Sequence, residues 1–291
     1  MTDNIPHRIS VLVRAHNDIM FISRTLDGLL SQECTYPFEI ICCDDASSDG
    51  TAEVISACAG IKKLESPGGV YVPGRVLNHL VRHCSGDIVV FNNADAPPLN
   101  KFYLERLIQP LADGVADAVF ANQQPRADAF WLVRKDHLRA FGDGRIAEKW
   151  RHNFSLAASG TLRELLLAEP FNEEFSYSED IEWCYCRTSR RVRYVADALV
   201  EHSHNYTYGE LYRRFYGEGY ADGLMFSVGG SSFLRAFCGA WAEVLRDWLF
   251  LLRHPSGWGE ILSAPVRRVI QRVSFRNGRR DALKIRTGGR S

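Results

Sequence analysis

Three short apolar segments, each followed by polar residues, constrain the fold of this chain more than any other feature. They cover residues 9–13, 38–43 and 87–91, are rich in Val and Ile, and are too short for helices. Helical patterns separate them, and the first of these has Asn17 or Asp18 placed to cap it. Alternating strands and helices predict right-handed crossovers and a mostly parallel sheet. The expected fold class is therefore α/β.

Further helices and strands continue the alternation along the chain. Helical patterns cover residues 51–59, 76–84 and 102–111, and strand patterns cover residues 117–121 and 192–195. Residues 122–148 are polar and interrupted by Gly and Pro, which predicts loops and short helices above the ligand site.

The C-terminal part of the chain has a different character. Amphipathic helices are predicted at residues 233–252 and 261–275, and from Ser231 onward twelve Lys/Arg stand against four Asp/Glu. Their apolar stripes are formed by Trp241, Leu245, Trp248, Leu249 and Leu252, and by Val266, Val269, Ile270 and Val273. We expect a catalytic domain over residues 1–225 and a basic helical extension over residues 226–291. Docking on the catalytic domain, a homodimer interface and contact with an anionic membrane are all open for the extension.

The expected compartment follows from what the sequence lacks. The first residues show no basic region before an apolar stretch, and no stretch reaches the ~18 apolar residues of a spanning helix. Eight cysteines in such a chain predict reduced thiols. The whole chain has a net charge of zero, which gives no reason to expect a nucleic-acid partner. We expect a cytoplasmic protein, located at the inner face of the plasma membrane if the extension binds lipid.

Each of the first three strands runs into polar residues at its carboxyl end. They are Arg14, His16 and Asn17 after the first strand, Asp44 and Asp45 after the second, and Asn93 and Asp95 after the third. In an open parallel sheet, ligands bind beyond the carboxyl ends of the strands. Carboxylates there can accept hydrogen bonds from a ribose, and a divalent cation lets them approach a diphosphate. Arg14 and Arg75 are candidates for binding phosphate oxygens. Taken alone, the Asp-rich segment is equally typical of a strand-to-helix turn.

Two later clusters also combine chemically useful side chains. Glu179 and Asp180 precede Trp183, so one acid could be a general base and the indole a flat surface for an acceptor sugar. An acidic helix N-terminus, favoured by the helix dipole, is the alternative. His202 and His204 occupy alternate positions after an apolar segment, which directs both rings to one face and suits a shared ligand or metal. A structural histidine pair is the alternative there.

The order of these motifs resembles that of family-2 glycosyltransferases, especially bacterial rhamnosyltransferase-like enzymes of surface-polysaccharide assembly. The motifs are residues 13–18, 39–51, 74–78 with 85–91, 123–126, 170–173, 179–183 and 202–204. The resemblance covers roughly residues 9–220, and seven ordered motifs are far harder to obtain by chance than one. It implies a GT-A fold, a nucleotide-diphospho-sugar donor, and a glycan or lipid-linked acceptor.

The resemblance also implies roles for the candidate residues. The donor nucleotide would be bound by Arg14, His16, Asn17, Asp44, Asp45, Arg75, Asn78 and Asn93. A divalent cation, Mg²⁺ or Mn²⁺, would be bound by Asp95, His202 and His204. The acceptor hydroxyl would lose its proton to Asp180, next to Glu179, and Trp183 would contact the acceptor. Asn93 stands where the family has the first acid of its Asp-x-Asp motif, and a neutral ligand binds a hard cation less well.

The implied reaction is an inverting transfer, in which nucleoside diphosphate leaves as the acceptor oxygen attacks the anomeric carbon. Two other functions compete with it. A sugar nucleotidyltransferase would present a Gly-rich loop near the first strand, and residues 9–18 contain no glycine. A non-catalytic relative that binds sugar or scaffolds an assembly is favoured by Asn93, and opposed by the retained acids and histidines.

Overall fold

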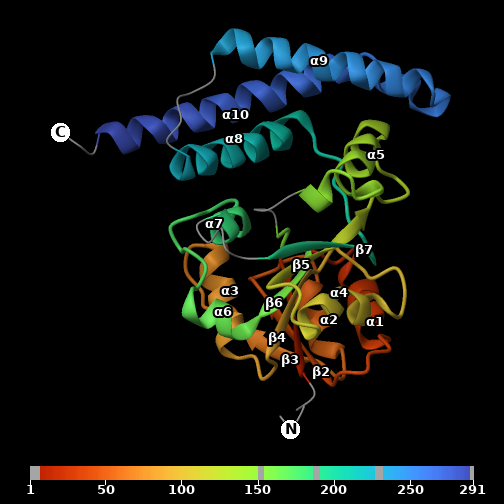
Figure 1. Ribbon diagram of the computed structural model, residues 1–291, viewed down its shortest axis with the longest axis vertical. Coiled ribbons are helices and arrows are strands. Elements are labelled where there is room, and N and C mark those ends of the chain that lie inside the picture. Colours follow the sequence, from red (N-terminus) through yellow and green to blue (C-terminus); the bar gives the residue numbers. More distant parts are fainter. Residues whose placement is uncertain (1–6, 150–153, 186–190, 227–231, 289–291) are drawn as a thin grey trace. The chain divides into compact units, whose positions relative to one another are not determined.

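The chain folds into two compact units, each of which gathers segments from separate parts of the sequence (Figure 1). The computed structural model describes residues 7–149, 154–185, 191–226 and 232–288. The sheet unit comprises Met1–Arg126, Leu138–Glu174 and Glu179–His202. The helical unit comprises Ala127–His137, Phe175–Ser178 and Ser203–Ser291.

A seven-stranded sheet forms the centre of the sheet unit (Figure 1). The strands are β1 (Ile9–Ala15), β2 (Phe38–Asp44), β3 (Lys62–Glu65), β4 (Ile88–Asn93), β5 (Ala118–Gln124), β6 (Ala158–Leu162) and β7 (Val192–Glu201). Their order is β3-β2-β1-β4-β6-β5-β7, and only β6 runs antiparallel to its neighbours in this sheet. The predicted mostly parallel α/β sheet is confirmed.

Helices cover both faces of this sheet. They are α1 (Ile22–Leu30), α2 (Thr51–Ala57), α3 (Pro73–Arg82), α4 (Tyr103–Ala112), α6 (Arg163–Ala168) and α7 (Glu179–Tyr185), with short turns η1 (Leu138–Gly142) and η2 (Ala147–Lys149). Neighbouring residues of β1 enter opposite clusters, because Val11 and Val13 pack on the face with α1 and α4, and Leu12 packs on the face with α3. Burial on both faces explains why the strands read as continuous apolar segments.

The start of α1 differs from the prediction. Neither Asn17 nor Asp18 caps the helix, which begins at Ile22 after an N-cap at Phe21 without a side-chain hydrogen bond. The backbone of Asn17 is left-handed, with φ 56°, and the amide of Asp18 donates to Thr51 Oγ1 at 2.8 Å. These two residues are therefore held by the loop after β2, and the chain turns into a helix only later.

The cysteines within the described ranges are free thiols, and four of the seven are buried. Burial raises the pKa of Cys43 to about 11, so this thiol stays protonated near neutral pH. Cys186 lies outside the described residues. The four buried thiols act as small core residues rather than nucleophiles.

The helical unit contains α5 (Trp131–His137), α8 (Tyr208–Met225), α9 (Phe233–Leu252), η3 (Pro255–Glu260) and α10 (Ser263–Gly288). A capping box formed by Thr207 and Glu210 starts α8. Helices α8 and α10 pack with their backbones in direct contact, since a Cβ added to Gly219 would lie 2.0 Å from the carbonyl oxygen of Phe275. Helix α8 lies on the catalytic side of the domain boundary predicted after residue 225, yet it groups with the later helices.

A buried cluster of charges ties α5, α9 and α10 together. Asp247 of α9 is fully buried and accepts hydrogen bonds from Lys135 of α5 and from Arg268 of α10, whose Nε lies 2.6 Å away. Arg268 also donates to Asp136 at 2.8 Å. A charge this deep in a protein is tolerated because its partners are in place.

We predict that Asp247→Ala destabilises the protein by ~3–5 kcal/mol, because it leaves the buried charge of Lys135 without its carboxylate and Arg268 with Asp136 alone. Urea unfolding followed by circular dichroism measures this loss. Arg246→Gln, at a side chain 56% exposed, is the matched control and should change stability by less than ~1 kcal/mol. Equal stability of Asp247→Ala and the native protein would contradict a structural role for the cluster.

Candidate active site

The register of three adjacent strands brings their polar ends to one edge of the sheet. Ala15 of β1 lies opposite Asp44 of β2, and Arg14 lies opposite Asn93 of β4. Past the strand ends, the amide of Asp45 still donates to the carbonyl oxygen of Ala15 at 2.9 Å. The predicted meeting of these strand ends at a single edge is confirmed.

The loop after β1 is locked to the loop after β2 by His16 and Asn17. Nδ1 of His16 donates to the carbonyl oxygen of Asp45 at 2.6 Å. The amide of Asn17 donates to Ser47 Oγ at 2.8 Å, and its side-chain oxygen accepts from the amide of Ser48 at 2.9 Å. Asparagine tolerates the left-handed conformation that this arrangement requires. Both residues thus shape the edge on which the two aspartates lie.

Asp44 and Asp45 are half-buried at this edge. Asp44 accepts hydrogen bonds from the amide and hydroxyl of Ser47, at 3.0 and 2.5 Å, and Asp45 accepts from the hydroxyl of Ser66 at 2.5 Å. Each carboxylate has more acceptor positions than these contacts use, so both can also accept hydrogen bonds from a ligand.

Asp18 adds a further carboxyl at this edge, and the sequence predicted it only as a helix cap. Its side chain accepts from the amide of His16 at 2.9 Å. Burial raises the pKa of Asp18 to about 6, and the nearby charge of Asp95 acts in the same direction. A cation or several hydroxyl donors bound near Asp18 and Asp95 would stabilise the charges of these two acids.

Arg14 connects the sheet edge to the acids of α7. Its Nη1 lies 3.8 Å from Glu179 Oε1, is itself buried, and has no hydrogen-bond acceptor among the described residues. Burial raises the pKa of Glu179 to about 6, and the Arg14 charge opposes that shift. The neighbouring Asp180 is half-buried, with Oδ1 accepting from the amide of Ile181 at 2.8 Å.

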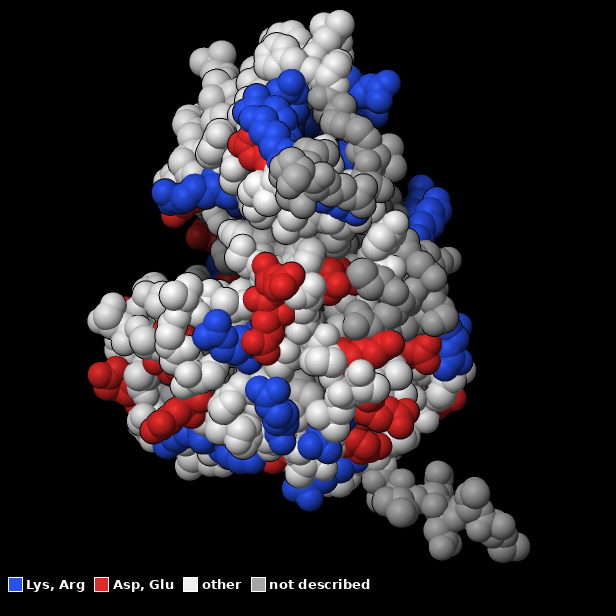
Figure 2. Space-filling view, turned by 90° about the vertical axis from the view of Figure 1, so that its left-hand side faces the viewer, with Lys and Arg blue, Asp and Glu red and all other residues white. Residues whose placement is uncertain are grey.

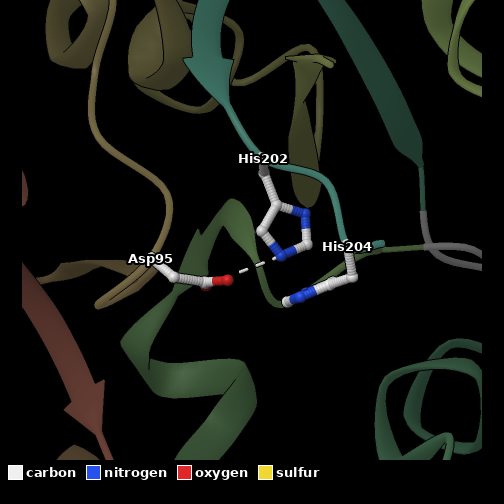
Figure 3. Close-up of side chains that lie close together, drawn as sticks. All are labelled: Asp95, His202 and His204. Atoms are coloured by element: carbon white, nitrogen blue, oxygen red, sulfur yellow. Dashed lines mark ion pairs between the residues drawn. The ribbon is translucent and has the colours of Figure 1, made fainter. Parts of the chain in front are cut away.

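Asp95, His202 and His204 form a cluster suited to a metal ion (Figure 3). One ligand atom from each lies within 4.8 Å of the others, and Asp95 is buried. Figure 3 shows both histidines on the segment that leaves β7, with the His202 ring directed at Asp95, where Nε2 lies 3.6 Å from Oδ1. One carboxylate with two imidazoles is a donor set that fits Mn²⁺ better than Mg²⁺, which prefers oxygen alone.

Two residues that had no individual role in the sequence-based prediction hold this cluster. Gln123 Nε2 donates to Ser155 Oγ at 2.6 Å, which turns its Oε1 toward His202 Nδ1 at 2.8 Å. Nδ1 of His202 therefore donates to Gln123, and Nε2 is the ring nitrogen that faces Asp95. Arg126 Nη2 donates to Asp95 Oδ2 at 3.1 Å, and its guanidinium stacks on the ring of Phe21 at 3.8 Å. Only their place in the 123–126 motif could have indicated them.

Asn78 is a correction to the predicted donor site. It is buried, and its amide donates to the carbonyl oxygen of Phe171 at 2.9 Å and accepts from the Phe171 amide at 2.9 Å. A third bond, to Glu173 at 3.1 Å, occupies its other hydrogen, so Asn78 holds the segment before α7 and has no side-chain hydrogen left for a donor nucleotide. Arg75 lies 3.9 Å from Glu173, with its side chain 38% exposed, and remains accessible to a phosphate.

Trp183 is a second correction. Its side chain is fully buried, and the indole packs on Phe154 and Phe171 with ring centroids 5.1 and 5.8 Å away. Its Nε1 donates to the carbonyl oxygen of Glu169 at 2.8 Å. A ring in this environment offers no face to an acceptor sugar, so Trp183 anchors α7 to the core.

Comparison with known proteins identifies the family of this chain. The glycosyl transferase family 2 profile matches residues 10–166. The O-antigen chain rhamnosyltransferase RfbN of Salmonella typhimurium is 24% identical over 271 residues, covering 86% of this chain and 83% of that protein. Its counterpart WbaN of Salmonella anatum is 26% identical over 253 residues, covering 78% and 76%.

Solved structures share the fold at lower identity. A mannosyltransferase from Pyrobaculum calidifontis, solved with GDP-Man and Mn²⁺, has a TM-score of 0.63 and 18% identity over 92% of this chain and 87% of that one. Glucosyl-3-phosphoglycerate synthase from Mycobacterium tuberculosis, solved with Mn²⁺ and UDP, has a TM-score of 0.54 and 23% identity, covering 72% and 76%. The fold is GT-A, and because the family profile matches more than half of its length, the chain belongs to glycosyl transferase family 2.

Proposed function

We propose that this glycosyltransferase moves a sugar from a nucleotide-diphospho-sugar to an acceptor hydroxyl, with inversion, during assembly of a bacterial surface polysaccharide. The observation that carries this proposal is the sheet edge, where strand register brings Arg14 and Asp44 together, and Asp45 and Asp95 follow the ends of β2 and β4. The Salmonella relatives, which are O-antigen chain rhamnosyltransferases, support a growing glycan or lipid-linked glycan as acceptor.

The donor would lie along this edge with its nucleoside against Asp44 and Asp45. Both carboxylates are half-buried and can accept hydrogen bonds from the base or the ribose hydroxyls. The diphosphate would extend toward Arg14, whose buried Nη1 has no hydrogen-bond acceptor among the described residues, and toward Arg75. Asn93, opposite Arg14 in the sheet, can approach the diphosphate without the repulsion that an acid would exert.

Asp180 is the proposed general base. Its half-buried carboxylate would take the proton from the acceptor hydroxyl as that oxygen attacks the anomeric carbon. Glu179 would act as its positioning neighbour, held at the start of α7 next to Arg14. The transition state is expected to resemble an oxocarbenium ion, with negative charge growing on the departing diphosphate.

Asp95, His202 and His204 would hold a divalent cation, for which we propose Mn²⁺. When bound, the cation would neutralise charge on the leaving diphosphate. Gln123 positions His202 for this role by fixing the ring tautomer, and Arg126 leaves Oδ1 of Asp95 on the side of the histidines. With Asn93 in place of an acid, the cation has one anionic ligand fewer, and Arg14 and Arg75 would carry more of the charge on the diphosphate.

A binding or scaffolding role without catalysis is the alternative that one observation favours, namely Asn93 in the Asp-x-Asp position. Two observations support an enzyme. The first is Glu179, a buried acid next to Arg14. The second is His202, whose ring is oriented by Gln123. Simple sugar binding requires neither arrangement.

For location we propose peripheral contact with the inner face of the plasma membrane, where a lipid-linked acceptor would be accessible. Among the described residues, no helix is long and apolar enough to cross a bilayer. This proposal assigns catalysis to a domain over residues 1–225 and membrane contact to a basic extension over residues 226–291.

We predict that Asp180→Asn lowers sugar transfer by ~10²–10⁴-fold, because the acceptor hydroxyl loses its base, and leaves nucleotide affinity unchanged. Single-turnover transfer and calorimetric nucleotide binding measure the two effects separately. Glu174→Gln, at an exposed acid a few residues earlier, is the control and should keep full activity. An Asp180→Asn protein with near-native turnover would remove Asp180 from the mechanism.

We predict that Gln123→Leu weakens Mn²⁺ binding by ~10–100-fold, because His202 loses the acceptor that fixes its tautomer. Gln123→Glu keeps that acceptor and should bind Mn²⁺ at least as well as the native protein. Titration of Mn²⁺ followed by electron paramagnetic resonance gives the affinities without an activity assay. Equal affinity in all three proteins would show that Gln123 does not position His202, and a native protein that binds no Mn²⁺ would overturn the metal proposal itself.

A further inference from the structure

Helix α9 exposes a continuous apolar stripe along its outer side. Leu234, Trp241, Leu245, Leu249 and Leu252 follow a helical spacing, and their exposed fractions range from 40% to 69%. The opposite side is buried and formed by Ala236, Ala240, Val244, Asp247 and Leu251. Twenty residues of helix make this stripe ~30 Å long. An exposed apolar surface of this extent indicates a partner.

A row of arginines borders the stripe. Arg235, Arg246 and Arg253 are exposed and separated by three and two helical turns, so they lie in line beside the leucines. Figure 2 shows one face of the molecule, on which the charged side chains of the helical unit are mostly blue. Arginine can lay its apolar stem along such a surface while its head binds a phosphate.

We propose that this face of α9 lies in the headgroup layer of an anionic bilayer, with the leucines and Trp241 toward the acyl chains and the arginine row on lipid phosphates. A helix that carries an apolar stripe beside a cationic one is built for an interface rather than for crossing a membrane. The inference deepens the proposed peripheral location, and it depends on the proposed function only in that a lipid-linked acceptor would be presented there.

The charges of α9 argue against a second copy of the chain as the occupant. A two-fold contact must be self-complementary, so the arginine row would need acids on the same face. Helix α9 has two acids, and both are turned inward, with Glu243 13% exposed and Asp247 fully buried. Each is already paired, Glu243 with Arg246 and Arg272, and Asp247 with Lys135 and Arg268. Arg246 thus already has an acid beside it, whereas Arg235 and Arg253 have none on α9, and the lipid phosphates of a membrane would supply that negative charge.

Helix α10 does not share this role, although its sequence predicts a similar basic amphipathic surface. Arg267 and Arg268 are 8% and 7% exposed and serve internal contacts, the first with the carbonyl oxygen of Tyr206 and the second with Asp247. Of its predicted apolar stripe, only Val266 is exposed, at 45%. The predicted stripe of α10 is therefore largely covered, whereas the stripe of α9 is exposed along its length.

Vesicle flotation of the full-length protein tests this assignment without donor or acceptor. Phosphatidylcholine vesicles containing phosphatidylglycerol should bind the native protein, and vesicles of phosphatidylcholine alone should bind it far less. Arg235→Gln with Arg246→Gln and Arg253→Gln should lower the partition constant about fivefold per arginine, and added salt should do the same to the native protein. Leu245→Gln with Leu249→Gln should lower it at least ~10-fold.

Two exposed positions of the sheet unit give matched controls, Leu167→Gln and Arg82→Gln, which should float like the native protein. Thermal unfolding checks that all variants are folded. A native protein that does not float, or α9 variants that float normally, would overturn the proposal. So would a dimer that the α9 variants convert to monomers in size-exclusion chromatography, because the stripe would then join two copies. Transfer to a short water-soluble acceptor, measured alongside, tests the proposed reaction independently.

Discussion

The parallel register of β2, β1 and β4 fixes where the polar strand ends of this protein lie. Backbone hydrogen bonds set Asp44 opposite Ala15, and Arg14 opposite Asn93, so three loops far apart in sequence must leave from the same edge. A shift of one residue would exchange the two faces of a strand and remove its apolar side chains from the core. The core that stabilises the sheet therefore also keeps the ligand-binding loops in place.

Much of the fold could be predicted because its central strands are buried on both faces and read as unbroken apolar segments. Two strands could not be predicted in this way. Edge strand β3 is Lys-Lys-Leu-Glu, and only its pairing with β2 makes it a strand. Strand β6 contains small and polar residues and lies antiparallel between β4 and β5, a non-local pairing that no local pattern indicates. The grouping of α5 with the C-terminal helices depends on ion pairs to Asp247 and Arg268, which are over 100 residues away.

The candidate site was predicted best where the backbone alone places a residue. Arg14 and Asp44 lie at the carboxyl ends of β1 and β2, and Asp45 follows β2, so a correct sheet puts all three at the edge. Side-chain direction could not be read in the same way. A seven-residue helix such as α7 does not reveal which side packs, and Trp183 proved to be core rather than a sugar platform. Gln123 was missed because its role depends on which way an amide faces, and this is set by Ser155, 32 residues later.

The central claim is that the carboxyl edge of β1, β2 and β4 binds the nucleoside diphosphate part of a sugar donor. Calorimetric titration of UDP, GDP and dTDP into the native protein and Asp45→Ala tests it most directly. One nucleotide should bind the native protein in a one-to-one complex, and Asp45→Ala should weaken that affinity about 10–100-fold, as expected for a lost hydrogen bond to a charged group. A native protein that binds none of the three, or an Asp45→Ala protein with unchanged affinity, would contradict the account.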